Sequence, residues 1–213
     1  MELQKIYVAR GDTLHLATKV CDYSGILVLM PPTNRNLKTT LMLMKGAKFT
    51  ADYIKIAAPD KDIYGKSSAS NPYTGCEIRM DGETVFALPG VTNTIACPLT
   101  ITGGAAGSTI ARIENTNTGL LTLDTSATIG TLKMTKGSLV LPATLATAPR
   151  IETLECASGV TADLGGKTLQ VGTLIGAPVV TNGRIWSDLP ARYKLELLRR
   201  VRDEGLGLVL ADW

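Results

Sequence analysis

The order of apolar and polar residues repeats in the middle of the chain. Between residues 98 and 183 the pattern apolar-x-x-apolar returns four times, with first residues 19, 22 and 20 positions apart. The four segments are Ile110–Ile113, Ile129–Leu132, Ile151–Leu154 and Val171–Leu174. A period near twenty is typical of a chain that winds in stacked coils, because each coil has an inward face that only its neighbours can cover.

A second short apolar strand lies within each period. It returns at Leu99–Ile101, Leu121–Leu123, Leu139–Leu141 and Ala162–Leu164, and glycines follow the first set at Gly119, Gly137, Gly159 and Gly183. Residues 121–129 alternate with period two and are rich in threonine, which favours strands over a helix. Two strands and a glycine turn per period predict a parallel β-solenoid (β-helix) over residues 98–186, with Ile, Leu and Val inside and Thr, Lys and Glu outside.

The first 97 residues carry seven short apolar runs separated by turn-forming residues. The runs are 5–8, 13–16, 26–30, 41–44, 53–56, 77–80 and 85–88. They predict an irregular β-rich region over residues 1–97, within an all-β protein. Two organisations stay open, a small β-sandwich or earlier, degenerate coils of the same solenoid. Gly25 and Gly46 lie 21 residues apart and favour the continuous solenoid.

The third region, residues 187–213, is predicted to be an amphipathic α-helix followed by an apolar tail. The helix spans 187–204: Ser187 or Asp188 can cap it, Pro190 suits its first turn and Gly205 ends it. Leu189, Tyr193, Leu197 and Val201 form an i, i+4 stripe, whereas Arg192, Arg199, Arg200 and Arg202 lie largely elsewhere.

Two roles for this C-terminal region stay open. It can cap the last coil and hide a strand edge that would otherwise recruit another chain. Alternatively, its apolar side chains form the contact by which copies assemble or dock on a larger particle. The residues predicted for that contact are Tyr193, Leu197, Val201, Leu208, Leu210 and Trp213.

Composition narrows the possible partners. Basic residues are scattered and the net charge is only +3, so we expect no nucleic-acid surface. No apolar run is long enough to cross a bilayer, and residues 1–6 contain no apolar leader core, so we expect a protein without a membrane segment that is made in a cytoplasm. The cysteines Cys21, Cys76, Cys97 and Cys156 form no C-x-x-C motif, and we expect most of them to be buried, with a disulfide as the less favoured alternative.

Few residues offer catalytic or cofactor chemistry. His15 is the single histidine, which leaves no basis for a metal site, and we expect a strand residue without a catalytic role. The run 103–107 is glycine-rich but lacks the Lys-Ser/Thr of a phosphate-binding loop, so it is interpreted as a corner of the solenoid. Arg10-Gly11-Asp12 is interpreted as a tight turn between two strands. We therefore predict no catalytic residue and no cofactor.

Polysaccharide cleavage is the enzymatic alternative to test, because a β-helix can place carboxylates on one outer face. The candidate residues are Glu114, Asp124, Glu152, Glu155 and Asp163. No vertical column of carboxylates is evident, and threonine and lysine are as common as acids at outward positions. A solvated outer face is therefore the preferred interpretation.

One segment resembles a known family. The run Ala162–Leu174, Ala-Asp-Leu-Gly-Gly-Lys-Thr-Leu-Gln-Val-Gly-Thr-Leu, resembles the repeat of autotransporter-type adhesin passenger domains, which are right-handed parallel β-helices. This resemblance covers less than half of the chain and implies a solenoid with a surface or adhesive role. Such solenoids also resemble parts of bacteriophage tail and head-fibre proteins, and Tyr7–Leu14 resembles the first hairpin of immunoglobulin-like domains in some phage baseplate proteins.

These observations together predict a non-catalytic structural or attachment protein. The first hypothesis is a bacteriophage virion component that is made in the host cytoplasm, assembles as a homo-oligomer such as a trimer, and contacts other virion proteins. The trimer is expected because about four clear coils leave large ends relative to the core. The alternative is a bacterial cell-surface adhesin or polysaccharide-binding protein that recognises a surface glycan, although aromatic residues make up only 5% of the chain.

Overall fold

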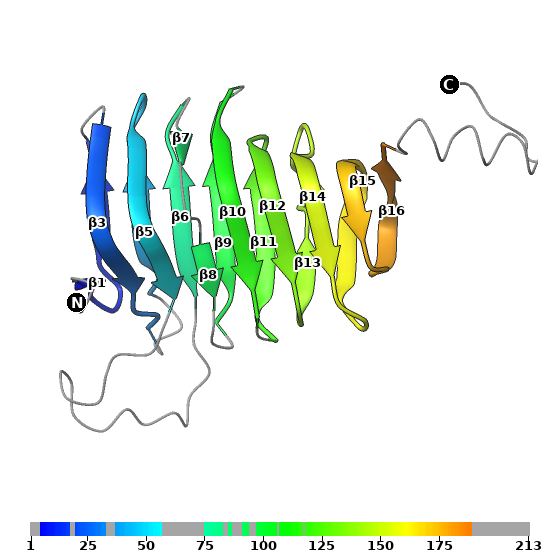
Figure 1. Ribbon diagram of the computed structural model, residues 1–213, viewed down its shortest axis with the longest axis horizontal. Coiled ribbons are helices and arrows are strands. Elements are labelled where there is room, and N and C mark those ends of the chain that lie inside the picture. Colours follow the sequence, from blue (N-terminus) through cyan, green and yellow to red (C-terminus); the bar gives the residue numbers. More distant parts are fainter. Residues whose placement is uncertain are drawn as a thin grey trace, which may run out of the picture.

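The described part of the chain is built entirely from β-strands. The computed structural model describes residues 5–17, 20–32, 37–56, 75–82, 85–86, 91–93, 97–105, 107–116 and 118–188. Within these residues there are sixteen strands and no helix (Figure 1). The strands are β1 (Lys5–Val8), β2 (Thr13–Leu16), β3 (Val20–Leu29), β4 (Thr39–Leu43), β5 (Lys48–Ile56), β6 (Cys76–Met80), β7 (Val85–Phe86), β8 (Val91–Asn93), β9 (Leu99–Gly103), β10 (Thr109–Asn115), β11 (Leu120–Thr125), β12 (Thr128–Met134), β13 (Ser138–Val140), β14 (Arg150–Cys156), β15 (Thr161–Ile175) and β16 (Val179–Ser187).

All of these strands belong to one parallel sheet that folds back on itself. Fourteen of them follow the order β1-β3-β5-β7-β10-β12-β14-β15-β13-β11-β9-β6-β4-β2, while β8 pairs with β5 and β10, and β16 pairs with β15. The path begins at β1 and ends at β2, which are neighbours in sequence, so the sheet is nearly closed. All pairs are parallel, and most strands pair with the next strand but one in sequence, such as β1 with β3 and β2 with β4. This makes the fold β-helix-like.

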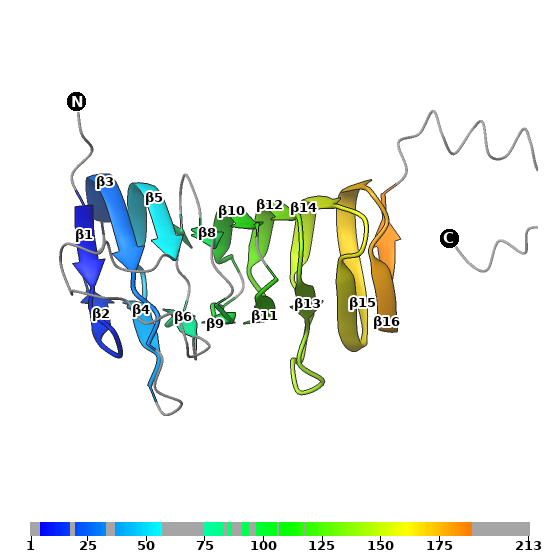
Figure 2. The same ribbon diagram turned by 90° about the horizontal axis from the view of Figure 1, so that it is seen from below.

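Two ladders face each other across the core (Figure 2). The first ladder comprises β1, β3, β5, β7, β8, β10, β12, β14 and the second half of β15, and the second ladder comprises β2, β4, β6, β9, β11, β13 and the first half of β15. The chain visits the two ladders alternately, and β15 is long enough to belong to both. Each inner strand therefore pairs with an earlier and a later strand of the same ladder. From β9 onward the paired residues lie about twenty positions apart, whereas those of β4 with β6 and of β5 with β8 lie 37 apart.

The apolar repeat predicted from the sequence is confirmed by the register of the first ladder. Ile110 pairs with Ile129, Ile129 pairs with Ile151, and Ile151 pairs with Val171. All four side chains are buried. The second predicted set aligns in the same way, because Leu121 pairs with both Leu99 and Leu139 in the second ladder.

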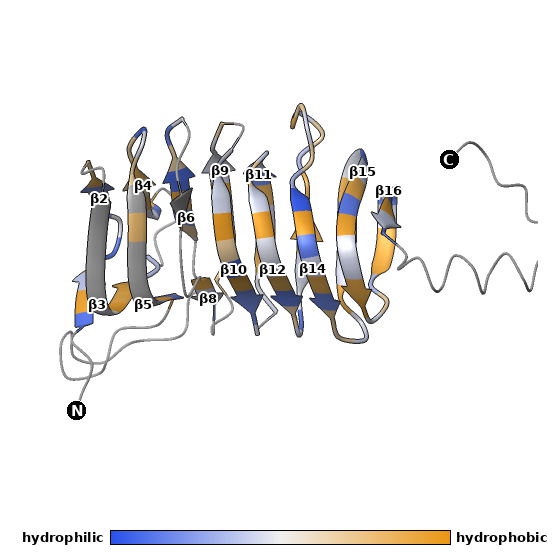
Figure 3. Ribbon diagram, turned by 45° about the horizontal axis from the view of Figure 1, so that its top comes forward, coloured by the Kyte–Doolittle hydropathy of each residue, from blue (hydrophilic) through white to orange (hydrophobic). Residues whose placement is uncertain are grey.

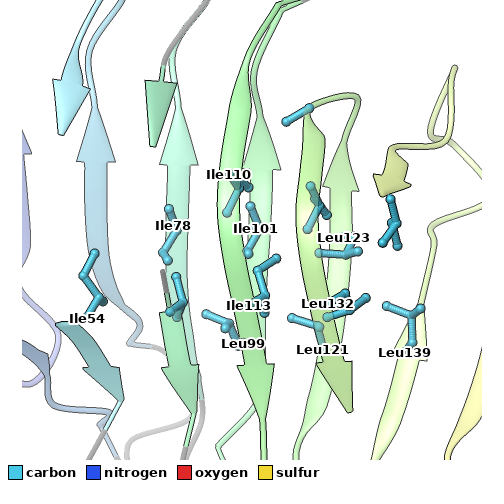
Figure 4. Packing of buried hydrophobic residues seen from close by; sticks show 14 of the residues in the cluster. Ile54, Ile78, Leu99, Ile101, Ile110, Ile113, Leu121, Leu123, Leu132 and Leu139 are labelled. Carbon is cyan, nitrogen blue, oxygen red and sulfur yellow. The ribbon is translucent and has the colours of Figure 1, made fainter. Parts of the chain in front are cut away.

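The core lies between the ladders and runs along the whole stack. One of its columns in the first ladder consists of Ile6, Leu27, Ile54, Val91, Ile113, Leu132, Leu154 and Leu174. Figure 4 shows side chains of both ladders, among them Ile113 and Leu121, inside the space that the ladders enclose. Because each apolar side chain lies against its neighbours in the adjacent layers, stacking removes apolar surface from water at every step.

The strands of the first 97 residues continue these ladders. β5 pairs with β8 and β8 with β10, while β6 pairs with β9, all in parallel. The parallel pairing agrees with the continuous arrangement and differs from the antiparallel sheets of a β-sandwich. Each of the seven predicted runs overlaps a strand, and residues 87–88 of the last run lie outside the described residues. Strands β3 and β5 begin five or more residues before the predicted runs at 26 and 53.

The apolar-x-x-apolar motif has a physical explanation in a strand bend. In a regular strand successive side chains alternate between faces. In β12, Gly130 and Thr131 both lie outside the core, between the buried residues Ile129 and Leu132. A Cβ added at Gly130 would lie 2.5 Å from the backbone oxygen of Ala111 in the preceding layer. The strand therefore bends at this motif, and adjacent layers approach closely there.

The predicted C-terminal helix requires one correction. Ser187, a proposed helix cap, is the last residue of β16, where it pairs with Val171. Pairing with the preceding layer explains this, because the strand continues for as long as β15 offers a partner. Residues 189–213 lie outside the described residues, so the rest of the helix stays a prediction. In the part of the chain that the structure describes, no helix is long and apolar enough to cross a membrane.

The close approach of adjacent layers can be tested with two matched glycines. Gly176 and Gly159 have similar positive φ angles of 88° and 84°. A Cβ at Gly176 would lie 1.9 Å from the backbone oxygen of Cys156 in the adjacent layer, whereas a Cβ at Gly159 meets nothing within 4 Å. Both alanine variants should lose about 1 kcal/mol through the unfavourable φ. Gly176→Ala should lose a further ~1–3 kcal/mol through the clash. Urea unfolding measures both, and equal losses would contradict the layer spacing.

Candidate functional site

The residues predicted for an assembly contact cannot be placed. Tyr193, Leu197, Val201, Leu208, Leu210 and Trp213 all lie outside the described residues. The candidate carboxylates of the enzymatic alternative, in contrast, are all described. They lie on the outer faces of the stack, on β10, β11, β14 and β15.

Two of the carboxylates belong to a column of alternating charge on the first ladder. Glu114 pairs with Lys133, and Lys133 pairs with Glu155 in the next layer. The Lys133 Nζ lies 3.4 Å from Glu114 Oε1, and the Arg112 guanidinium donates to Glu114 Oε2 at 3.2 Å. Lysine between two glutamates keeps like charges from lying on adjacent strands. This column balances charge and does not gather carboxylates.

Glu152 and Asp188 share one arginine at the end of the stack. The Arg150 Nε donates to Glu152 Oε1 at 2.8 Å, and Arg150 Nη2 donates to Asp188 Oδ2 at 3.2 Å. The hydrogen bond to Glu152 and then the one to Asp188 raise the pKa of Arg150 above its usual range. Glu152 is therefore paired with a cation on its own strand.

Asp163 and Asp124 each line a separate shallow surface pocket. Asp163 Oδ1 accepts from the Gly165 backbone N at 3.0 Å, and both of its oxygens accept from Asn182 Nδ2 at 3.2 Å. Asn182 has a positive φ of 49°. The pocket at Asp163 has a volume of about 440 Å³, and the one at Asp124 about 220 Å³.

The loop between β13 and β14 separates the two pockets. Its first half, with Pro142 and Ala143, lines the pocket at Asp163, and its second half, with Leu145, lines the pocket at Asp124. Each pocket therefore holds a single carboxylate, whereas hydrolysis by an acid and base pair needs two that flank one bond. No group of three or more His, Cys, Asp and Glu among the described residues could hold a metal ion.

The Arg10-Gly11-Asp12 tripeptide lies in a turn and His15 lies on a strand, as the sequence predicted. In the Arg10-Gly11-Asp12 turn between β1 and β2, the Asp12 backbone N donates to Ala9 O at 3.1 Å, and Gly11 has a φ of 84°. The predicted tight turn is confirmed. His15 lies on β2 as an exposed strand residue that pairs with Met42.

Three of the four cysteines are buried free thiols, as predicted. They are Cys76, Cys97 and Cys156. The pKa of the Cys76 thiol is raised, first by its hydrogen bond with the Cys97 thiol and then by burial. Burial raises the pKa of Cys156 to about 11. Reactive cysteines need a stabilised thiolate, so these environments favour packing over nucleophilic chemistry.

Sequence reasoning missed a buried polar ladder at one corner of the stack. Asn93 and Asn115 pair across adjacent strands of the first ladder, and both are fully buried. The Asn93 amide donates to Cys97 O at 2.8 Å, and the Asn115 amide donates to Gly119 O at 3.3 Å and to Lys136 O at 3.2 Å. Both asparagines thus bond the carbonyl four residues ahead, which fixes the turn into the second ladder.

Threonine hydroxyls add hydrogen bonds between layers at the same corner. The Thr116 hydroxyl donates to Asn93 O at 3.2 Å, and the Thr135 hydroxyl donates to Asn115 O at 3.3 Å. The layers that contain Asn115 and Thr135 are therefore each tied to the layer before by a side chain as well as by backbone. The sequence contained this pattern, because both asparagines stand two residues after an apolar strand residue, Val91 or Ile113.

Comparisons with known proteins add no assignment. No protein-family model matches the chain, and no curated protein or solved structure matches it.

The buried asparagine ladder can be tested by removing one amide. Asn115→Ala leaves two buried or partly buried carbonyls without their amide donor, and we expect unfolding free energy to fall by ~1–3 kcal/mol. Gln170→Ala removes an exposed amide on the outer face of β15 and should change it by less than ~0.5 kcal/mol. Urea unfolding followed by circular dichroism measures both values. A loss at Asn115 no larger than the loss at Gln170 would contradict the role given to the ladder.

Proposed function

We propose that this protein is a parallel β-solenoid that serves as a non-catalytic structural or attachment component of a bacteriophage virion. The observation that carries the proposal is the in-register stacking of equivalent apolar residues through successive layers of both ladders. Such stacking supports an elongated, regular body whose outer faces are available to partners.

The pairing order supports the solenoid. Each passage of the chain from the first ladder to the second and back advances it by one strand in both ladders. The hydrogen bonds of every inner layer are thereby made to the layers before and after it. A winding chain explains this order, because strands adjacent in sequence fall in opposite ladders and strands one repeat apart fall side by side.

The outer faces support a structural role rather than catalysis. Glu114 forms an ion pair with a lysine and Glu152 with an arginine. Asp163 accepts hydrogen bonds from the Asn182 amide and from the Gly165 backbone N–H. The two surface pockets each offer one carboxylate. These groups are arranged to satisfy one another within the stack, which is the arrangement expected of a solvated face.

The virion setting is drawn from the resemblance of phage tail and head-fibre solenoids to residues 98–186. In that setting the protein is made in the host cytoplasm, assembles as a homo-oligomer such as a trimer, and contacts other virion proteins. Both ends of the stack favour association, because exposed apolar residues lie in the first layer, at Ile6, and in the last, at Val179.

The second candidate is a surface adhesin that binds a glycan. The pocket beside Asp163 favours it, since a carboxylate, the Asn182 amide and the backbone of Gly165 and Gly166 line one hollow. Carboxylate and amide groups are suitable partners for sugar hydroxyls. This candidate shares the solenoid and the attachment role, and differs in localisation, at a bacterial cell surface, and in its partner.

A panel of acidic and neutral glycans incubated with the full chain tests the non-catalytic role. We expect no turnover, because Glu114 and Glu152 are in ion pairs and Asp124 and Asp163 each line a separate pocket. Turnover that is abolished by Asp163→Asn or Glu152→Gln, and retained by the surface control Gln170→Ala, would contradict the proposal. Light scattering should give a mass of two or more times 22.6 kDa, and a mass of 22.6 kDa would contradict the homo-oligomer. Neighbouring capsid or tail genes would support the virion setting.

A further inference from the structure

Two cysteines lie together inside the stack, between neighbouring layers of the second ladder. Strands β6 and β9 are side by side in this ladder (Figure 3), and Cys76 on β6 pairs with Leu99 on β9. Cys97 comes two residues before Leu99. Cys76 is 1% exposed and Cys97 is 0% exposed, and both belong to the apolar core. The two thiols therefore share one buried site, although they are 21 residues apart in sequence.

One carbonyl oxygen holds both cysteines. Pro98 O accepts from the Cys76 backbone N at 2.9 Å and from the Cys97 Sγ at 3.3 Å. The Cys76 thiol also forms a hydrogen bond with the Cys97 thiol. The Asn93 amide donates to Cys97 O at 2.8 Å and fixes the second cysteine at the corner of the stack. A disulfide has narrow geometry, so it forms where the backbone already brings two sulfurs together, as it does here.

We propose that Cys76 and Cys97 are a disulfide site that links two adjacent layers of the stack when the protein meets a disulfide oxidant. In the structure both residues are free thiols. One S–S bond between them joins β6 to the chain that leads into β9. This bond adds a covalent link to the backbone pairing of the two strands.

The oxidation is a thiol–disulfide exchange with a small-molecule disulfide such as oxidised glutathione. One cysteine thiolate attacks a glutathione sulfur, the glutathione S–S bond breaks, and one glutathione thiolate leaves. The second cysteine thiolate attacks the protein sulfur of this mixed disulfide and releases the second glutathione. Two cysteine sulfurs are oxidised and one glutathione disulfide is reduced to two thiols. The two cysteine protons pass to the two departing thiolates.

Burial decides when this exchange takes place. The hydrogen bond with Cys97 and then burial raise the pKa of the Cys76 thiol, which keeps this thiol protonated in the finished stack. Glutathione also needs access to the sulfur that it attacks. The exchange therefore takes place during folding or during transient opening of the layer. Disulfides persist in oxidising surroundings and are rare in a cytoplasm, so the site is a thiol pair in one setting and a link in the other.

Cys156 provides a comparison within the same chain. It is also a free thiol, 8% exposed. Asn93, whose amide bonds Cys97 O, is followed along its column by Asn115, Met134 and Cys156. Three layer spacings place Cys156 about 14 Å along the stack from Asn93, which is beyond the reach of a disulfide. The disulfide site goes beyond the role proposed above and does not rest on it.

Refolding of the full chain in glutathione buffers tests the site. Trypsin cleaves after Arg79, between the two cysteines, so the disulfide joins two separate peptides, 67–79 and 80–112. Mass spectrometry of the alkylated, unreduced digest should find the linked pair after refolding with oxidised glutathione. After refolding with reduced glutathione it should find both cysteines alkylated. Absence of the linked pair from the oxidised sample, or linkage of either cysteine to Cys156 in comparable yield, would overturn the proposal.

Thermal unfolding of matched variants tests the link between layers. The disulfide closes a loop of about 20 residues in the unfolded chain, so the oxidised chain should melt about 5–10 °C above the reduced chain. This gain should remain in Cys156→Ala and disappear in Cys76→Ala and in Cys97→Ala. Comparing the oxidised and reduced samples of one variant cancels the packing lost by the substitution. A gain that survives in Cys76→Ala, or no gain in a chain that contains the linked peptides, would refute the link.

Discussion

The structure depends on one constraint: each layer can cover its apolar inward face and its hydrogen-bonding edge only with the next layer. Parallel strands about 4.8 Å apart bring equivalent residues of successive repeats into direct contact. Ile110, Ile129, Ile151 and Val171 form such a column, and columns of this kind run through both ladders. Apolar burial and backbone pairing therefore grow together with each layer, and the body is stable as a stack rather than as single hairpins.

The same constraint explains why successive layers have equivalent residues at their corners and why the first and last layers are left uncovered on one side. Asn93 and Asn115 occupy equivalent buried positions because adjacent layers turn in the same way, and an amide there satisfies carbonyls that would otherwise be buried without a donor. The first and last layers lack one neighbour. Ile6 is 44% exposed, although every interior member of its column from Leu27 to Leu154 is buried. The ends are thus the natural places for caps and contacts.

Much of the fold could be predicted because apolar residues recur at a regular spacing in the sequence. The spacing of Ile110, Ile129 and Ile151 gave the register directly, and the outward threonines and charges followed from strand alternation. The ladders of the first 97 residues were harder to predict, because the spacing of the apolar runs is irregular there and the sequence does not show where β3 and β5 begin.

Ser187 was assigned to a helix because local capping preference favours it, whereas pairing with Val171 extends β16. The candidate carboxylates were located correctly on outer faces, but their ion pairs were not foreseen. Glu114 and Glu152 pair with arginines two residues away on the same strand, and Glu114 also pairs with Lys133 in the next layer. The buried Asn93 and Asn115 were missed because polarity alone suggested exposed turns.

Disulfide trapping on the outer face tests the stacking most directly. Thr131 pairs with Thr153, and Thr153 pairs with Thr173, so cysteines at adjacent positions lie within disulfide reach, whereas those at 131 and 173 are two layers, about 9.6 Å, apart. Mild oxidation of the three double-cysteine variants, followed by mass spectrometry of tryptic peptides, should show intramolecular disulfides in Thr131→Cys/Thr153→Cys and in Thr153→Cys/Thr173→Cys, with none in Thr131→Cys/Thr173→Cys. A disulfide between positions 131 and 173, or none in either adjacent pair, would contradict the layered structure.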